Sequence, residues 1–144
     1  MKKRNFIIVF AIVLALVGCQ ELIGSFTASI NGVAWTASVS GAVKQGPQYI
    51  ITATKDTSVI LITIPGLTVG NYIINPMDTT LDAVVYTPNT GTPAKSYIGT
   101  QGDVNLSKVS LGRLTGTFAV WAKNTQNPND SIPLSGQFSN ILSN

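Results

Sequence analysis

The strongest constraint on the fold of this chain is a series of short segments in which apolar and polar residues alternate. Residues 26–30 (FTASI) and 33–39 (VAWTASV) alternate in this way, and Asn31-Gly32 lies between them. A period of two places one apolar face against a core, as in a half-buried β-strand. Asn-Gly between two such runs predicts a β-hairpin, because a type I′ turn needs positive φ at both turn positions.

Similar runs continue to the end of the chain and are separated by Gly, Asn and Pro. From residue 19 onward the sequence contains 16 Thr, 12 Ser and 12 Gly but a single Glu, a composition of strands and turns rather than helices. The apolar runs argue against disorder. The run at 59–64 (VILITI) is apolar on both faces, which predicts a central strand.

These runs recur at intervals of about 8–14 residues, as in antiparallel all-β domains. We therefore predict one all-β domain, a β-sandwich or a small β-barrel of about nine or ten short strands. The expected strands are 26–30, 33–39, 49–54, 59–64, 70–74, 82–87, 96–99, 103–109, 114–123 and 131–142.

A short repeat, L-[ST]-G-x-F, occurs at 114–118 (LTGTF) and 134–138 (LSGQF). The polar segment between the copies indicates two neighbouring antiparallel strands. Glycine in a strand lets the backbone bend or a large ring lie over it. Two copies are too few for a solenoid.

The N-terminus has the features of an export signal. Residues 1–5 (MKKRN) are basic, and 6–17 (FIIVFAIVLALV) is an uninterrupted apolar run. A spanning helix needs about 20 apolar residues, so this run is too short for a conventional membrane anchor. The basic start favours a secretory signal peptide over a buried core helix.

The apolar run ends in Leu16, Val17, Gly18 and Cys19. This segment resembles the lipobox of bacterial lipoproteins. The resemblance implies that a diacylglycerol is transferred to the Cys19 thiol. It also implies that the lipoprotein signal peptidase recognises Leu16, Val17 and Gly18 and cleaves before Cys19, and that the new amino group is then acylated. Two or three acyl chains anchor a protein stably, whereas one does not. The family's sorting pattern, with Gln20 after the cysteine, favours the outer membrane.

The expected organisation is a signal peptide at 1–18, a lipidated tether at 19–25 and an all-β domain at 26–144. The short tether places the domain close to a membrane surface. The pieces FTASINGVAWTA, ITIPGLTVGNY, LGRLTGTFAVWA and LSGQFSNI resemble those of small Bacteroidota lipoproteins of unknown function, although the 75–103 region is longer and richer in loops here. That resemblance supports the fold and the location and implies no activity.

Charge and composition exclude several functions. Three of the nine basic residues precede the apolar run, and from residue 19 onward six Lys and Arg balance six Asp and Glu. We therefore expect no nucleic-acid partner. The chain has no His and one Cys, so it lacks the imidazole of a Ser-His-Asp or Cys-His site and the ligands that zinc prefers. We expect no metal and no cofactor apart from lipid on Cys19.

Trp121 is the candidate ligand contact. In the strand at 114–123 it shares a face with Arg113, Thr115 and Thr117, whereas Trp35 alternates with Val33, Ala37 and Val39 and is expected in the core. A tryptophan on a polar face is a ligand platform, a cover over the end of the sheet or a membrane contact.

The other candidates have structural interpretations. Tyr49, Tyr72, Tyr86 and Tyr97 are expected in cross-strand packing. Asp78 and Asp82 are the carboxylate pair closest in sequence, but they lie in a predicted loop and favour turn or capping roles over glycosidase catalysis. The segment 124–130 (NTQNPND) holds one carboxylate without an EF-hand pattern, which favours a solvated hairpin loop over a calcium site.

The sequence therefore predicts a lipid-anchored envelope protein that is not an enzyme. Its expected role is a binding module for a glycan, a lipid or an envelope protein. The alternative is a structural or assembly subunit whose exposed strands pair with a larger partner.

Overall fold

The computed structural model describes residues 24–74, 84–92 and 95–143, and every regular element in these ranges is a β-strand. One ten-stranded sheet has the order β2-β1-β10-β9-β8-β7-β5-β4-β3, and β6 pairs with β8 outside this order. The predicted antiparallel all-β fold is confirmed. The strands are β1 (Ser25–Ile30), β2 (Val33–Thr36), β3 (Val39–Gln45), β4 (Gln48–Lys55), β5 (Ser58–Ile64), β6 (Gly70–Ile74), β7 (Val84–Thr87), β8 (Tyr97–Ser110), β9 (Arg113–Asn124) and β10 (Ser131–Leu142).

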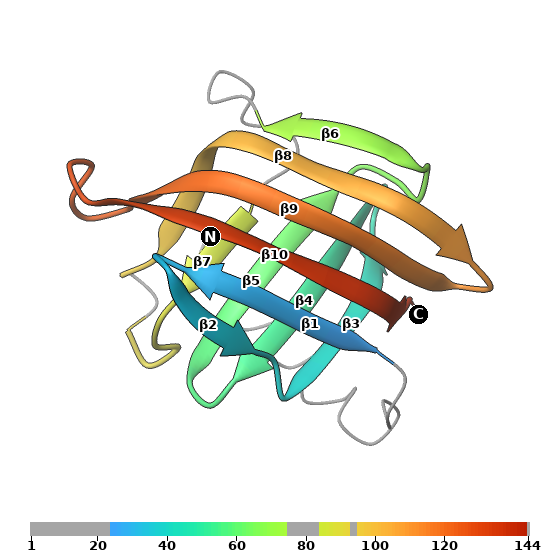
Figure 1. Ribbon diagram of the computed structural model, residues 1–144, viewed down its shortest axis with the longest axis horizontal. Helices are drawn as coiled ribbons and strands as arrows, with labels where there is room; N and C mark the ends of the chain where they lie inside the picture. Colours follow the sequence, from blue (N-terminus) through green and yellow to red (C-terminus); the bar gives the residue numbers. More distant parts are fainter. Residues whose placement is uncertain (1–23, 75–83, 93–94, 144) are drawn as a thin grey trace.

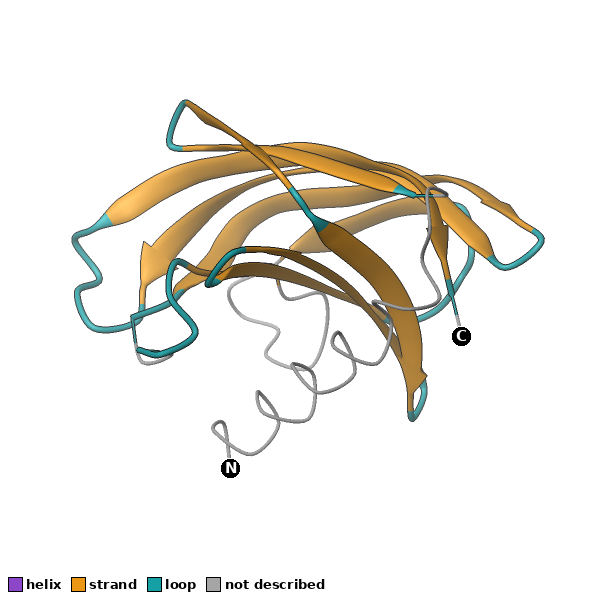
Figure 2. Ribbon diagram, turned by 90° about the horizontal axis from the view of Figure 1, so that it is seen from below, coloured by secondary structure: helices purple, strands orange, loops and turns teal. Residues whose placement is uncertain are grey.

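The sheet curls over on itself into a half-barrel (Figures 1 and 2). We call β2, β1, β10, β9, β8 and β6 the front layer. The back layer, β7, β5, β4 and β3, crosses behind it in Figure 1. The central position predicted for the run at 59–64 is confirmed, because β5 lies between β7 and β4.

β8 carries the sheet from the back layer to the front layer. Its first residues, Tyr97 and Ile98, pair with β7, whereas residues 102–106 pair with β6. The register shifts between Gly99 and Gln101, and Gly102 has a φ of 128°. The prediction of separate strands at 96–99 and 103–109 was wrong, because the bulge bends the strand without ending it.

Each margin of the sheet contacts the opposite layer without forming a ladder with it. The Trp35 Nε1 on β2 donates a hydrogen bond of 2.9 Å to the Ser58 hydroxyl on β5. At the opposite margin, Ala42 of β3 forms an isolated bridge with Ser143. No continuous ladder joins β2 to β3 within the described residues, so the curled sheet is a half-barrel, which is compatible with the predicted sandwich or small barrel.

Tight turns connect the consecutive antiparallel strands. Asn31 and Gly32 have φ values of 50° and 83°, and β1 pairs with β2 on either side of them. The predicted type I′ hairpin is therefore confirmed. The turn expected at 55–58 is also present, with Asp56 at a φ of 52° between β4 and β5.

The strand predicted at 33–39 is divided between the two layers. The Ala37 N–H donates to the Phe26 carbonyl of the front layer, and the next N–H, of Ser38, donates to the Thr54 carbonyl of the back layer. The chain changes layer at this point, and β3 follows where no strand was predicted. Trp35 is buried as expected, but Val33 is 68% exposed, which corrects its assignment to the core.

The core between the layers has two different compositions. On the front layer, Phe26 packs against Phe118 and Phe138, with ring centroids 5.6 and 6.1 Å apart. On the back layer, four fully buried isoleucines supply most of the apolar volume; they are Ile51, Ile60, Ile62 and Ile64.

The two copies of L-[ST]-G-x-F lie side by side on β9 and β10, as predicted. Phe118 pairs with Gly136, and Phe138 pairs with Gly116, so each ring meets the glycine of the other copy. A Cβ on Gly116 would lie 2.7 Å from the Phe138 ring, and a Cβ on Gly136 would lie 2.8 Å from the Phe118 ring. The glycines thus leave the space that the rings occupy, which confirms their predicted role.

Candidate binding face

Trp121 lies on β9 with its side chain on the surface of the front layer that faces away from the core. The side chain is 51% exposed, in agreement with its predicted polar register. Its cross-strand partners are Pro133 of β10 and Gln101 of β8. The Thr100 hydroxyl donates to the Trp121 carbonyl at 3.3 Å, which ties the backbone at this position to the β8 bulge.

The register of the front layer arranges the residues around Trp121 in cross-strand rows. We call the surface formed by three of these rows the outer face. The row across β1, β10, β9, β8 and β6 holds Thr27, Gln137, Thr117, Asn105 and Asn71. The next row holds Ser29, Ser135, Ala119, Asp103 and Ile73. The third holds Pro133, Trp121 and Gln101.

Uncharged hydrogen-bonding side chains dominate the outer face. Asp103 is the one charged residue in the three rows, and it lies between Ala119 and Ile73. Within the described part of the chain, no hydrogen bond engages the side chains of Thr27, Ser135 or Gln137. Their hydroxyl and amide groups therefore face solvent and are free to bind a ligand.

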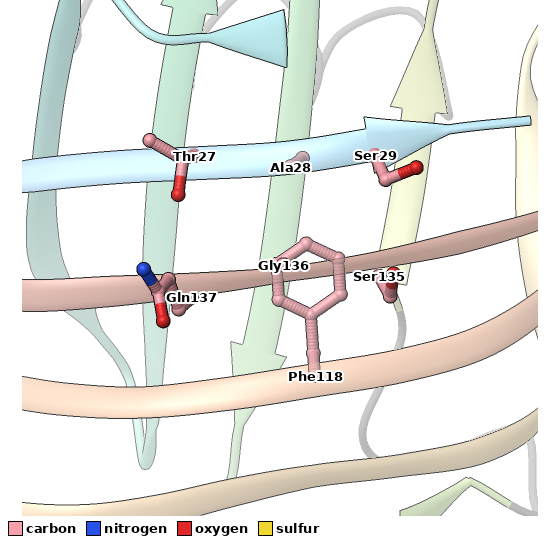
Figure 3. Close-up of a pocket in the computed structure, with 7 residues that line it drawn as sticks. All are labelled: Thr27, Ala28, Ser29, Phe118, Ser135, Gly136 and Gln137. Carbon is pink, nitrogen blue, oxygen red and sulfur yellow. The ribbon is translucent and has the colours of Figure 1, made fainter. Parts of the chain in front are cut away.

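A depression of about 320 Å³ opens on the outer face between β1 and β10. Thr27 and Gln137 lie at one end of it and Ser29 and Ser135 at the other, as Figure 3 shows. Ala28, Gly136 and the Phe118 ring complete its lining. The depression is shallow and open, so it fits part of a ligand lying on the surface rather than one enclosed in a pocket.

Gly136 gives the depression its shape. Its missing side chain lies on the core side, where a Cβ would be 2.8 Å from the buried Phe118 ring, so on the outer face Gly136 contributes backbone alone between Ser135 and Gln137. Phe118 is only 2% exposed and is held by its contact with Phe26. Two of the lining residues, Ala28 and Phe118, therefore have their side chains in the packed core, which anchors the backbone beneath the depression.

A hydrogen-bond network closes the β9–β10 hairpin beyond Trp121. The Tyr97 hydroxyl donates to Asp130 Oδ2 at 2.7 Å, and Asn124 Nδ2 donates to the same oxygen at 3.0 Å. These two bonds lower the pKa of the Asp130 carboxyl. The bond to Asp130, followed by burial, raises the pKa of Tyr97. The segment 124–130 forms the predicted hairpin loop, and Asp130 fixes its base.

The tyrosines pack as expected. Tyr86 and Tyr97 stack with centroids 6.1 Å apart, and burial raises the pKa of Tyr86. Tyr49 and Tyr72 pack against the core and are half-buried.

Several predicted residues lie outside the described ranges. They are the lipobox residues Leu16, Val17, Gly18 and Cys19 and the carboxylates Asp78 and Asp82. Among residues 24–74, 84–92 and 95–143, no group of three or more His, Cys, Asp and Glu side chains is placed to hold a metal ion. That part of the chain also contains no helix with the length and hydropathy of a membrane span.

Sequence reasoning placed Trp121 on the exposed face of its strand but did not single out the residues around the depression. Thr27 and Gln137 are 110 positions apart and come together through the pairing of β1 with β10. The L-[ST]-G-x-F repeat carried a partial signal, because Ser135 and Gln137 flank the glycine of its second copy. The pairing of the first strand with the last was the missing information.

No curated protein matches this sequence. A family described as "Domain of unknown function (DUF6252)" matches residues 23–141, which include all ten strands except the last residue of β10. The chain therefore belongs to the DUF6252 family of domains of unknown function.

Proposed function

We propose that this protein is a lipid-anchored, non-catalytic binding module of the bacterial cell envelope. Cys19 carries the lipid, and the outer face around Trp121 contacts a glycan, a lipid or another envelope protein. The observation that carries the binding role is a 51% exposed tryptophan among uncharged side chains with free hydrogen-bonding groups. An exposed tryptophan combines a large apolar surface with one donor, which suits a contact that is made and broken in water.

The support for the anchor is in the sequence. A basic start, the apolar run at 6–17 and the chain's single cysteine directly after Leu16, Val17 and Gly18 are arranged as in a lipoprotein signal. The first strand begins at Ser25, so five residues would separate this strand from lipid on Cys19. The proposal places the protein at the outer membrane.

The support for a non-catalytic role is the chemistry of the available side chains. The chain has no His, and the Asp130 carboxylate already accepts two hydrogen bonds at the base of the hairpin loop. Asp103, the one carboxylate of the outer face, pairs with Ala119 and Ile73, neither of which is a proton donor. An acid–base pair needs two such groups near one bond.

Metabolic labelling tests the anchor. In a bacterial host with the lipoprotein pathway, wild-type protein should incorporate a fatty-acid analogue and lose about 18 residues of signal peptide, the length before Cys19. Cys19→Ser should remain unprocessed and unlabelled. Ser143→Cys in the Cys19→Ser background controls for labelling of any cysteine. Labelling of Cys19→Ser would refute the anchor.

Tryptophan fluorescence tests the binding role. Trp35 is buried and bonded to Ser58, so a ligand on the outer face should change the emission of Trp121 alone. The full chain in detergent micelles is titrated with polysaccharides and with phospholipid vesicles, and partners are sought by crosslinking. Trp121→Phe should abolish the fluorescence response. A response that persists in this variant would place the contact elsewhere.

One observation favours the alternative, a structural or assembly subunit. β6 pairs with β8 on one side only among the described strands, and Ile73 on β6 and Val69 just before it are 69% and 56% exposed. An apolar edge strand can receive a strand from another chain. If this is the function, Ile73→Lys should abolish co-purification of a partner, whereas Trp121→Ala should leave it unchanged.

A further inference from the structure

We propose that the ligand of the outer face is a linear, uncharged polysaccharide that contacts Trp121 and the depression between β1 and β10 at the same time. This inference rests on the proposed binding function and specifies its ligand. It follows from the hydroxyl and amide side chains in the three rows of the outer face and from the spacing of these rows. It also follows because the rows lack the basic clusters and the contiguous apolar patch that other classes of ligand need.

The chemistry of the outer face matches sugar hydroxyls. Threonine and serine hydroxyls both donate and accept hydrogen bonds, and the amides of Gln137, Asn105 and Gln101 offer a donor and an acceptor side by side. A sugar ring also has an apolar face of C–H groups, which packs on an aromatic ring. Trp121 and its neighbour Pro133 provide such a surface.

The spacing of the face suits an extended chain. Neighbouring strands lie about 4.8 Å apart, close to the length of one pyranose unit, and successive rows lie about 7 Å apart along a strand. A chain that crosses the rows diagonally from the depression to Trp121 therefore meets a new strand or a new row with each sugar. The depression centres between β1 and β10 at the level of Gly136, and Trp121 lies three residues beyond Phe118 on β9. This geometry separates the two contact points by about 10–15 Å, a distance that a short oligosaccharide spans.

The same residues disfavour other ligands. An anionic polysaccharide or phospholipid headgroup calls for a cluster of Arg or Lys. The three rows contain no basic residue, and the exposed Lys108 and Lys123 are single cations in the rows beyond Thr117 and Trp121, at opposite ends of the face. A protein or an acyl chain calls for a contiguous apolar patch, whereas Trp121 and Pro133 are separated from Ile73 by Asp103 and Ala119. A neutral polysaccharide needs neither basic residues nor a contiguous apolar patch for binding.

Rigidity supports a binding role for the depression. The backbone beneath it carries Phe118, whose ring is buried on the core side against Phe26 and Gly136. A surface that does not reorganise on binding loses little conformational entropy. The register of β1 with β10 therefore fixes the backbone positions from which Thr27 and Ser135 present their hydroxyls.

The test measures binding of the full chain in detergent to three probes. These are neutral glucose and mannose oligosaccharides of increasing length, polygalacturonate, and vesicles that contain phosphatidylglycerol. We expect binding to a neutral oligosaccharide that strengthens with length until both contact points are filled. Trp121→Ala should raise Kd about tenfold, and Gln137→Leu, which keeps the volume and removes the amide, about fivefold.

Leu111→Ala is the matched control, because Leu111 is 95% exposed at the far end of the β8–β9 hairpin. It should leave Kd unchanged, and all three variants should unfold at the wild-type midpoint. Neutral-oligosaccharide binding that neither Trp121→Ala nor Gln137→Leu weakens would overturn the inference. Binding to polygalacturonate or to vesicles alone would also overturn it but leave the proposed function standing. Absence of binding to every probe, without a crosslinked partner, would count against both.

Discussion

The two layers that enclose the core fill it by different means. The front layer inserts three phenylalanine rings, two of which occupy space that Gly116 and Gly136 leave open. The back layer fills its half with four isoleucines, Ile51 on β4 and Ile60, Ile62 and Ile64 in alternation along β5, and none of them packs against a glycine. The front half therefore depends on particular pairs of residues, whereas the back half depends on hydrophobic volume.

This contrast predicts the largest loss of stability at the front glycines. A Cβ at Gly116 would lie 2.2 Å from the Asn105 carbonyl oxygen as well as against Phe138, so both β8 and the ring would have to move. Gly116→Val should lower the free energy of unfolding by about 5 kcal/mol, as measured by urea denaturation. Gly66→Val is the control, because no atom lies within 4 Å of a Cβ there and little change is expected. Equal losses in the two variants would contradict the steric explanation.

The next effect is the loss of a front ring. Phe118 is 2% exposed and contacts Phe26 at 5.6 Å and the backbone at Gly136. Phe118→Ala should cost about 3–5 kcal/mol in calorimetric or urea unfolding, because it leaves a cavity and removes ring contacts. Phe118→Leu keeps much of the volume and should recover only part of the loss. Full recovery would show that the front half, like the back half, needs volume alone.

A conservative change in the back layer should cost far less. Ile62 is fully buried on β5 and pairs with Ile51 and Val84. Ile62→Val removes one methylene and should lower the free energy of unfolding by about 0.5–1.5 kcal/mol. A loss as large as that of Phe118→Ala would remove the distinction between the layers.

The smallest predicted effect is a dependence on pH at the end of the front layer. Hydrogen bonds from Tyr97 and Asn124 lower the pKa of Asp130 in the folded protein. Above about pH 3.9, the pKa of an aspartate in the unfolded chain, the ionised carboxylate contributes its full stabilisation. That stabilisation is lost as the pH falls through the lower pKa of the folded state. Tyr97 has a raised pKa, so its contribution is present at neutral pH and is lost as the pH rises through that folded value. The measurement is the midpoint of thermal unfolding as a function of pH. Tyr97→Phe should make this midpoint fall less steeply at acid pH than in the wild type, whereas the control Tyr49→Phe should leave the slope unchanged.

Local patterns predicted the parts of the fold that depend on neighbouring residues. Asn31-Gly32 fixed a hairpin, and the repeated Gly-x-Phe indicated that β9 and β10 are adjacent. The division between β2 and β3 was not predictable in this way, because the hydrogen bonds of Ala37 and Ser38 go to strands distant in sequence. The break predicted between residues 99 and 103 is a bulge within β8, because glycine occurs both in bulges and at strand ends.

In the candidate site too, the sequence predicted what depends on neighbouring residues and did not predict what depends on the pairing of distant strands. Alternation along β9 is local, so the exposure of Trp121 followed from it. The rows of the outer face required the pairing of β1 with β10 and of β6 with β8, which no short window of sequence contains.

The exchange of ring and glycine between β9 and β10 has a consequence for how this sequence can change over generations. Each phenylalanine occupies the place left by a glycine on the other strand, so the four positions, Gly116, Phe118, Gly136 and Phe138, are inherited as a linked set. A side chain gained at one glycine can persist only in a lineage that has reduced the facing ring and shifted the adjacent backbone. Across the family, substitutions at these positions should therefore occur in pairs, while the isoleucines of β4 and β5 drift one at a time.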